Sequence, residues 1–157
     1  MVEIIGISKK YSSGRGHVQA LSGVSLRVEK GGNLTLVGKS GSGKTTLMNC
    51  IGGIERPDTG SVLIDGSPIQ SLTERALCMF QRRHIGFVFQ SFNLLSFLTA
   101  AENIALPLHL NDADIKTINR RVAELLNLIG LPDIGPAMPH ELSGGELQRV
   151  AVARALA

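Results

Sequence analysis

The stretch that decides the fold reads GKSGSGKT over residues 38–45. It matches the pattern G-x-x-x-x-G-K-[S/T] in full, after an apolar run at 33–37 and before a helical pattern that begins near Lys44. Glycines let backbone N–H groups turn inward around phosphate oxygens, and the positive end of the following helix points at the same charge. The stretch therefore predicts a binding site for a nucleoside triphosphate rather than a plain glycine-rich turn.

Two side chains of this loop carry the expected chemistry. The Lys44 ammonium should reach the β- and γ-phosphates, and the Thr45 hydroxyl should be a ligand of Mg²⁺. Lys39 adds a second cation close to the phosphates. The loop alone leaves kinases, GTPases and ATPases open. The residues expected to contact the nucleotide here are Gly38, Lys39, Ser40, Gly41, Ser42, Gly43, Lys44, Thr45 and Thr46.

A second motif, LSGGELQR, occupies residues 142–149 and leads into an alanine-rich helical pattern. Ser143 and Glu146 form a capping box, which begins many helices and by itself implies no ligand. Two glycines inside a cap are unusual, because each weakens a helix by about 1 kcal/mol relative to alanine. They permit close approach of another backbone, so the Ser143 hydroxyl and the N–H groups of Gly144 and Gly145 are candidates to bind an anion.

The two motifs together resemble those of the ABC transporter ATP-binding family, whose signature L-S-G-G-x-x-x-R is reproduced from Leu142 to Arg149. The resemblance covers essentially all 157 residues. It implies an α/β fold, a P-loop NTPase of ABC type with an antiparallel β subdomain and an α-helical subdomain. It also implies ATP and Mg²⁺ as ligands and a head-to-tail homodimer of ATP-binding subunits. The signature residues that would act in trans, on the ATP of the other subunit, are Leu142, Ser143, Gly144, Gly145 and Glu146.

Two further residues gain a role only through this resemblance. Tyr11, in Lys-Lys-Tyr-Ser-Ser-Gly, is similar to the family's adenine-stacking aromatic residue, although a tyrosine at a strand end is more often simply packed. Gln90, in Gly-Phe-Val-Phe-Gln, is similar to the family's catalytic Q-loop glutamine, which touches Mg²⁺ or the attacking water. The alternative for Gln90 is a polar residue that ends a strand. By resemblance, Gln90 would also report nucleotide state to a membrane partner.

The loop after Gln90 carries large apolar side chains over residues 92–98, which predicts either core packing or a docking groove. In the family, a transmembrane permease subunit docks in this region. The sequence of residues 82–95 and 102–108 most resembles that of the lipoprotein-releasing and macrolide-export branch of the family. We therefore expect an ATP hydrolase, peripheral on the cytoplasmic face of the membrane, that couples ATP binding and hydrolysis to export or lipoprotein extraction. Two alternatives stay open: a soluble ABC-type ATPase working on DNA or ribosomes, and a non-catalytic nucleotide-binding fragment.

Charge and hydropathy narrow the choice of partners. The 16 Lys and Arg residues against 13 Asp and Glu residues give a net charge of +3, a surplus too small to imply nucleic acid. We expect no nucleic-acid partner. The most apolar region, 85–110, is interrupted by polar residues and by Pro107, so it does not predict a membrane span. Any membrane-spanning segments would therefore be supplied by a partner protein.

We expect one incomplete ABC ATP-binding domain over residues 1–157. Its β subdomain and P-loop core would cover roughly 1–90, and its helical subdomain with the signature helix would cover 91–157. Apolar patterns predict strands at 2–8, 18–28, 33–37, 61–66 and 84–89. Helices are predicted from residue 44, after capping boxes at Ser71–Glu74 and Thr99–Glu102, and over 114–129.

Hydrolysis in this family needs a later strand aspartate, a neighbouring glutamate and a histidine. The sequence ends at Ala157, before the expected positions of the aspartate, the glutamate and the histidine. Val62–Asp65 resembles such a strand, but Gly66 follows where the glutamate belongs, and an Asp-Gly hairpin turn explains the pair. We therefore expect an incomplete central sheet, marginal stability and no ATPase activity of this chain alone.

Overall fold

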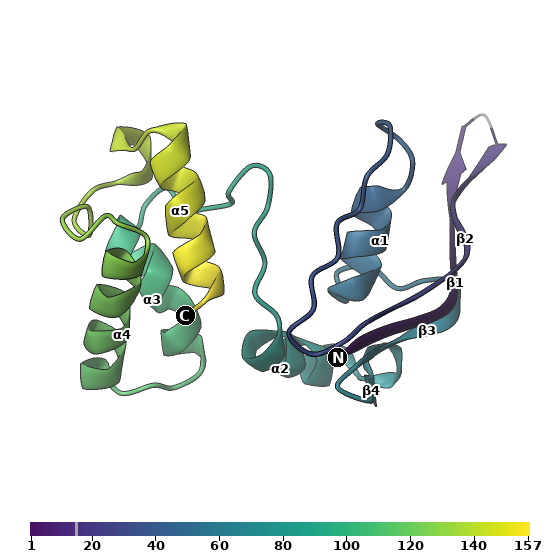
Figure 1. The fold of residues 1–157 in the computed structure, drawn as a ribbon, viewed down its shortest axis with the longest axis horizontal. Helices are drawn as coiled ribbons and strands as arrows, with labels where there is room; N and C mark the ends of the chain where they lie inside the picture. The colour runs from purple at the N-terminus through teal and green to yellow at the C-terminus, as the bar shows by residue number, and fades with distance from the viewer. Residues whose placement is uncertain (15) are drawn as a thin grey trace. The chain divides into compact units, whose positions relative to one another are not determined.

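The computed structural model describes residues 1–14 and 16–157. It divides into two compact units, Met1–Met79 and Phe80–Ala157, each with its own elements and its own buried residues (Figure 1). Helix α2 (Glu74–His84) contains the boundary. Within the described ranges, no helix combines the length and the apolar character that crossing a membrane would need.

The first unit is built on an antiparallel sheet. Its strands are β1 (Val2–Ser13), β2 (Gly16–Val28), β3 (Thr59–Ile64) and β4 (Ser67–Pro68), in the order β2-β1-β3-β4 across the described residues. Strand β1 pairs with both neighbours, and Ile4 lies opposite Leu26 on one side and Val62 on the other. The register of β1 shifts after Ile4, where Gly6 adopts a left-handed φ of 57°. This irregularity lets Ile4 and Ile7, three residues apart, both be buried.

The turn between β3 and β4 confirms the hairpin that the Asp-Gly pair predicts. Asp65 and Gly66 have φ angles of 47° and 79°, as a two-residue type I′ turn requires. Gly66 tolerates the left-handed conformation because it lacks a Cβ. The run Val62–Asp65 is therefore a hairpin strand.

Helix α1 (Lys44–Ile51) follows the glycine loop directly, as predicted, and ends at Gly52. Its apolar residues Leu47 and Cys50 are buried. Burial raises the pKa of the Cys50 thiol, so this cysteine stays protonated at neutral pH. The helix thus carries the end of the loop on a packed element.

The second unit is a cluster of helices, α3 (Ala100–Leu110), α4 (Ile115–Leu128) and α5 (Gly144–Ala155). Thr99 and Glu102 form the predicted capping box at the start of α3, and Asp114 caps α4. The amphipathic spacing predicted over 114–129 places the apolar side of α4 in the core. The buried residues of this core are Ala100, Ile104, Ala105, Ile118, Val122, Leu125, Leu126, Val150 and Ala153.

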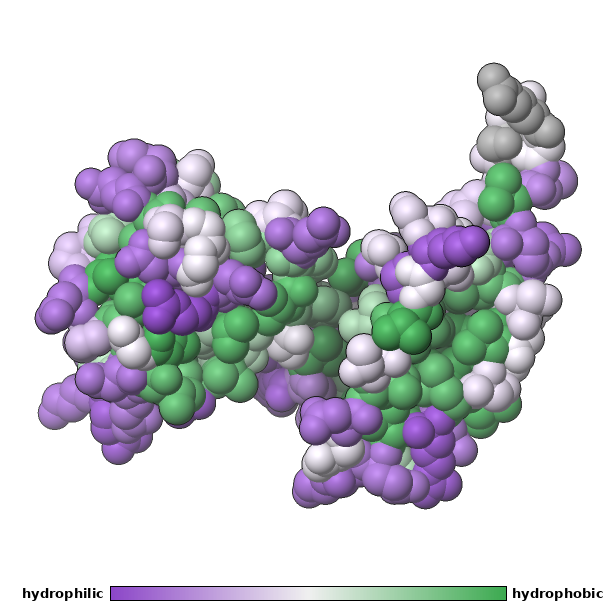
Figure 2. Space-filling model, turned by 45° about the horizontal axis from the view of Figure 1, so that its top comes forward, coloured by the Kyte–Doolittle hydropathy of each residue, from purple (hydrophilic) through white to green (hydrophobic). Residues whose placement is uncertain are grey.

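Two predicted strands are wrong for the described chain. Residues 33–37 and 85–89 have an irregular backbone, and α2 continues through His84. A strand needs a neighbour for its N–H and C=O groups, and no described strand pairs with either segment. Their apolar side chains are consequently half-buried or exposed, and Val37 is 85% exposed. Figure 2 shows hydrophobic residues on the visible face of the molecule.

The predicted capping box at Ser71–Glu74 is also wrong. Ser71 ends a short 3₁₀ helix (Ile69–Ser71), and its hydroxyl donates to the Pro68 carbonyl at 2.8 Å. The Thr73 hydroxyl instead accepts from the Ala76 amide at 3.3 Å at the start of α2. Thr73, and not Ser71, is therefore the residue whose side chain caps α2.

Candidate nucleotide-binding site

The glycine loop over residues 38–43 folds closely against strand β2. Gly41 and Gly43 have left-handed φ angles of 77° and 89°. A Cβ built on Gly43 would overlap the carbonyl oxygen of Ala20 on β2, and one on Gly38 would lie 2.8 Å from the Ser42 Oγ across the loop. The tight turn therefore requires glycine at residue 43, for both its backbone angle and its packing.

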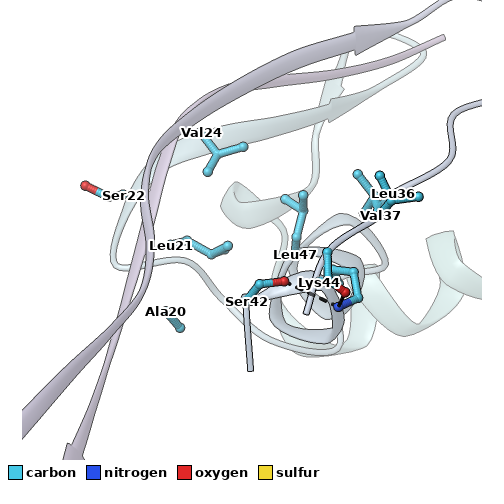
Figure 3. Close-up of a pocket in the computed structure, with 11 residues that line it drawn as sticks. Ala20, Leu21, Ser22, Val24, Leu36, Val37, Ser42, Lys44 and Leu47 are labelled. Atoms are coloured by element: carbon cyan, nitrogen blue, oxygen red, sulfur yellow. Dashed lines mark hydrogen bonds between the residues drawn. The ribbon is translucent and has the colours of Figure 1, made fainter. Parts of the chain in front are cut away.

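The Lys44 ammonium lies inside this turn (Figure 3). Its Nζ donates to the carbonyl oxygens of Gly38 at 2.7 Å and Lys39 at 2.8 Å, and it lies 3.3 Å from the Ser42 Oγ. The loop thus wraps its own backbone around a fixed positive charge. This cradle of glycine backbone, helix start and ammonium fits the triphosphate predicted from sequence.

A cavity of about 330 Å³ lies between the loop and β2. Leu21 and Val24 of β2 and Leu47 of α1 form its apolar side, while Ser42 and Lys44 supply its polar edge (Figure 3). The other predicted loop residues, Lys39, Ser40, Gly41 and Thr45, are exposed, and Thr46 is half-buried.

Tyr11, near the end of β1, lies beside helix α1. Its hydroxyl donates to the Glu55 carboxylate at 2.6 Å and lies 3.4 Å from the Thr46 Oγ1. The hydrogen bond to Glu55 raises the pKa of Tyr11, so the hydroxyl remains a donor at neutral pH. The structure therefore brings Tyr11 to the helix that follows the phosphate loop. Sequence reasoning missed Glu55, because nothing in its local pattern points to a partner on β1.

The signature residues form the start of α5 in the second unit. The Glu146 carboxylate accepts from the Ser143 amide at 2.8 Å and from its hydroxyl at 2.6 Å, which confirms the predicted capping box. These two hydrogen bonds lower the pKa of Glu146. Gly144 and Gly145 are exposed, and no described atom lies within 4 Å of a Cβ built on either. Leu142, by contrast, packs against the helical core.

Gln90 lies in an exposed turn of the second unit. The two residues that hold the loop after it, Arg154 and Asn103, were missed from sequence. Arg154, near the end of α5, donates to the carbonyl of Asn93 at 2.6 Å. The fully buried Asn103 of α3 pairs with Leu95 through both its amide oxygen and its amide nitrogen. An asparagine inside the apolar helix 100–110 was the signal available for Asn103.

Comparison with known proteins decides the family. A family model described as ABC transporter matches residues 21–157. This chain belongs to the ABC transporter family. Its relatives include the methionine import ATP-binding protein MetN of Escherichia coli O157:H7, 48% identical over 157 residues, which are 100% of this chain and 46% of the relative. MetN of Brucella abortus (strain 2308) is 54% identical over 142 residues, 90% of this chain and 38% of that protein. The chain thus spans less than half the length of these ABC family relatives.

Solved structures of the ABC family confirm the expected fold class. The dimeric structure of MJ0796, a bacterial ABC transporter cassette, matches with a TM-score of 0.93 and 38% identity, over 99% of this chain and 69% of that one. A post-hydrolysis state of the same ATP-binding cassette, bound to ADP and Pi, matches with a TM-score of 0.93 and 39% identity. The chain has the ABC ATPase cassette fold.

The comparisons do not support the expected branch of the ABC family. The relatives are named for methionine import, whereas the sequence around Gln90 predicts lipoprotein release or macrolide export. The sequence around Gln90 is therefore not specific to the export branch. Membership of the ABC transporter family supports a coarser statement, that the chain is the ATP-binding part of an ABC transporter.

Proposed function

We propose that this chain is the ATP-binding part of an ABC importer, which couples ATP binding and hydrolysis to solute passage through a transmembrane permease subunit. The names of the relatives, which are methionine importers, support import over the export or lipoprotein extraction expected from sequence. The proposed location is peripheral, on the cytoplasmic face of the membrane. Methionine is the first substrate to test.

The observation that carries the proposal is the Lys44 ammonium enclosed by the loop of residues 38–43. The loop amides and this ammonium would hold the β- and γ-phosphates, and the adenine would stack on Tyr11. Thr45 and Gln90 would hold Mg²⁺, which neutralises phosphate charge when it is bound. Gln90 would also orient the attacking water.

The open start of α5 supports a head-to-tail homodimer. No contact within the described chain requires glycine at residues 144 and 145, because a Cβ at either would meet no neighbour. We infer that these glycines allow another subunit to come close to the start of α5. Together with the Ser143 hydroxyl, their N–H groups would contact ATP bound to the other subunit. Both MJ0796 structures are dimeric.

Equilibrium binding of ATP tests the nucleotide site. We expect Lys44→Ala to weaken ATP binding by about tenfold to a hundredfold, because a charge-assisted hydrogen bond contributes about 1.5–3 kcal/mol. Lys30→Ala makes the same charge change at an exposed position of the same unit and should leave affinity unchanged. Equal ATP affinity of the wild type and Lys44→Ala would contradict the assignment of this loop as the ATP-binding site.

Uptake measurements test the direction and the substrate. The protein, co-produced with its permease in cells that lack their own methionine importer, should restore ATP-dependent uptake of labelled methionine. Lys44→Ala should abolish that uptake. Restored macrolide resistance without methionine uptake would reverse the proposed direction.

A further inference from the structure

Glu55 and Tyr11 form a contact that the proposed roles of the site do not use. The two residues are 44 positions apart in sequence, and the Tyr11 hydroxyl donates to the Glu55 Oε2 at 2.6 Å. The acceptor is a carboxylate, and such charge-assisted hydrogen bonds are roughly twice as strong as neutral ones. Tyr11 is 37% exposed, so a part of the residue remains open to a ligand.

Local structure fixes the Glu55 carboxylate. Glu55 follows the end of α1, where its amide donates to the Asn49 carbonyl at 3.2 Å and the Ile54 amide donates to the same oxygen at 2.9 Å. Its other carboxylate oxygen lies 3.7 Å from the Lys9 Nζ, and its side chain is only 24% exposed. The carboxylate is thus held from two sides.

The Tyr11 hydroxyl consequently connects to both ends of α1. Thr46 lies in the first turn of this helix, two residues after Lys44, and Glu55 lies just beyond its last turn. Because α1 starts at the phosphate loop, these contacts fix the ring relative to the place where phosphates would bind. A ring that is ordered before binding avoids the entropy loss of ordering it on binding.

We propose that Glu55 is a positioning residue that orients the Tyr11 ring for the base of the bound nucleotide. The inference rests on the proposed function, since it requires that Tyr11 contacts adenine. Glu55 touches no phosphate in this arrangement. Its effect should therefore fall on the nucleoside end of ATP and leave the triphosphate end unchanged.

The test measures the affinity of Glu55 variants for ATP and for inorganic triphosphate by calorimetry. We expect Glu55→Ala to weaken ATP binding by about twofold to tenfold, the effect of losing order in one side chain, with triphosphate binding unchanged. Glu55→Gln should recover part of the loss, because its amide oxygen still accepts from the hydroxyl. Asp58→Asn is the matched control: Asp58 also contacts Lys9, at 3.4 Å, but no hydrogen bond joins it to Tyr11 in the described residues.

A double-mutant cycle separates positioning from a merely structural role. Tyr11→Phe keeps the ring and removes the hydroxyl, so adding Glu55→Ala to it should weaken ATP binding no further. A loss that persists in the Tyr11→Phe background, or that affects triphosphate equally, would assign Glu55 to stability and overturn the proposal. Unchanged ATP affinity in Glu55→Ala overturns it as well. Failure of the wild type to bind ATP is a different outcome, because it removes the proposed function itself.

Discussion

The Arg154 guanidinium of α5 donates a hydrogen bond of 2.8 Å from Nη2 to the carbonyl oxygen of Phe92. Its Nη1 donates to the next carbonyl, that of Asn93. Phe92 and Asn93 both have left-handed φ angles, 61° and 49°, a conformation that asparagine adopts readily but that is strained for phenylalanine. The last turn of the signature helix therefore holds the strained loop that follows Gln90.

Replacing Arg154 with lysine should loosen this loop. A lysine ammonium lacks the planar fork that bonds two neighbouring carbonyls at once. We expect amide hydrogen exchange over residues 91–95 to accelerate about tenfold, as one charged hydrogen bond is lost, while exchange in α1 stays constant. Arg120→Lys, on the exposed face of α4, is the control. Unchanged exchange over 91–95 would contradict the role given to Arg154.

Gly43→Ala should destabilise the first unit and weaken ATP binding. The added Cβ would overlap the Ala20 carbonyl in a left-handed conformation, with a destabilisation of about 1–3 kcal/mol. Gly144→Ala adds the same atom where no described atom lies within 4 Å, so its melting temperature should not fall. Thermal melting of the two variants checks this contrast, and equal destabilisation would refute it.

Asn103→Leu should destabilise the second unit. The Asn103 side chain is fully buried, and its amide nitrogen donates to the carbonyls of Leu95, Leu98 and Thr99. Leucine would remove the acceptor of the Leu95 amide and the side-chain donor to these carbonyls, so we expect a loss of about 2–4 kcal/mol in urea denaturation. Asn119→Leu, at an exposed position of α4, serves as the comparison and should change stability little. A similar free energy of unfolding for both variants would be inconsistent with this role.

Acid should remove the contribution of Glu102 to stability. Hydrogen bonds from the Thr99 amide and hydroxyl lower the pKa of Glu102 below its ordinary value of 4.5. Because the folded-state pKa is lower than the unfolded one, the stabilisation is complete above pH 4.5 and is lost as pH falls through the lowered value.

Glu102→Gln should therefore flatten the acid side of the stability profile. Melting temperatures between about pH 3 and pH 7 provide the measurement, since carboxylates titrate in this range. Glu124→Gln, on the exposed side of α4, is the matched control. If the melting temperature of Glu102→Gln falls with acid as steeply as that of the wild type, protonation of Glu102 is not the cause of the acid destabilisation.

Features that depend on a few neighbouring residues could be predicted from sequence. The glycine loop, the Asp65-Gly66 turn and the Ser143–Glu146 capping box are of this kind, because their hydrogen bonds and φ angles arise within four or five residues. Residues 33–37 and 84–89 have the apolar composition of strands, but strand formation also needs a partner at a distance in sequence. Two contacts, one within each unit, are non-local in the same way: Tyr11 meets Glu55 across 44 positions, and Arg154 meets Phe92 across 62.

The contacts of Lys44 mean that filling this site is an exchange of partners. The ammonium already has three oxygens around it, two from backbone carbonyls and one from Ser42. A phosphate must compete with those oxygens, so the measured affinity reports the difference between two sets of hydrogen bonds and not the full attraction of a cation for a polyanion. In the proposed site, the loop's carbonyls would thereby act as an internal ligand, which would keep the charge in place between one nucleotide and the next and moderate how tightly each is held.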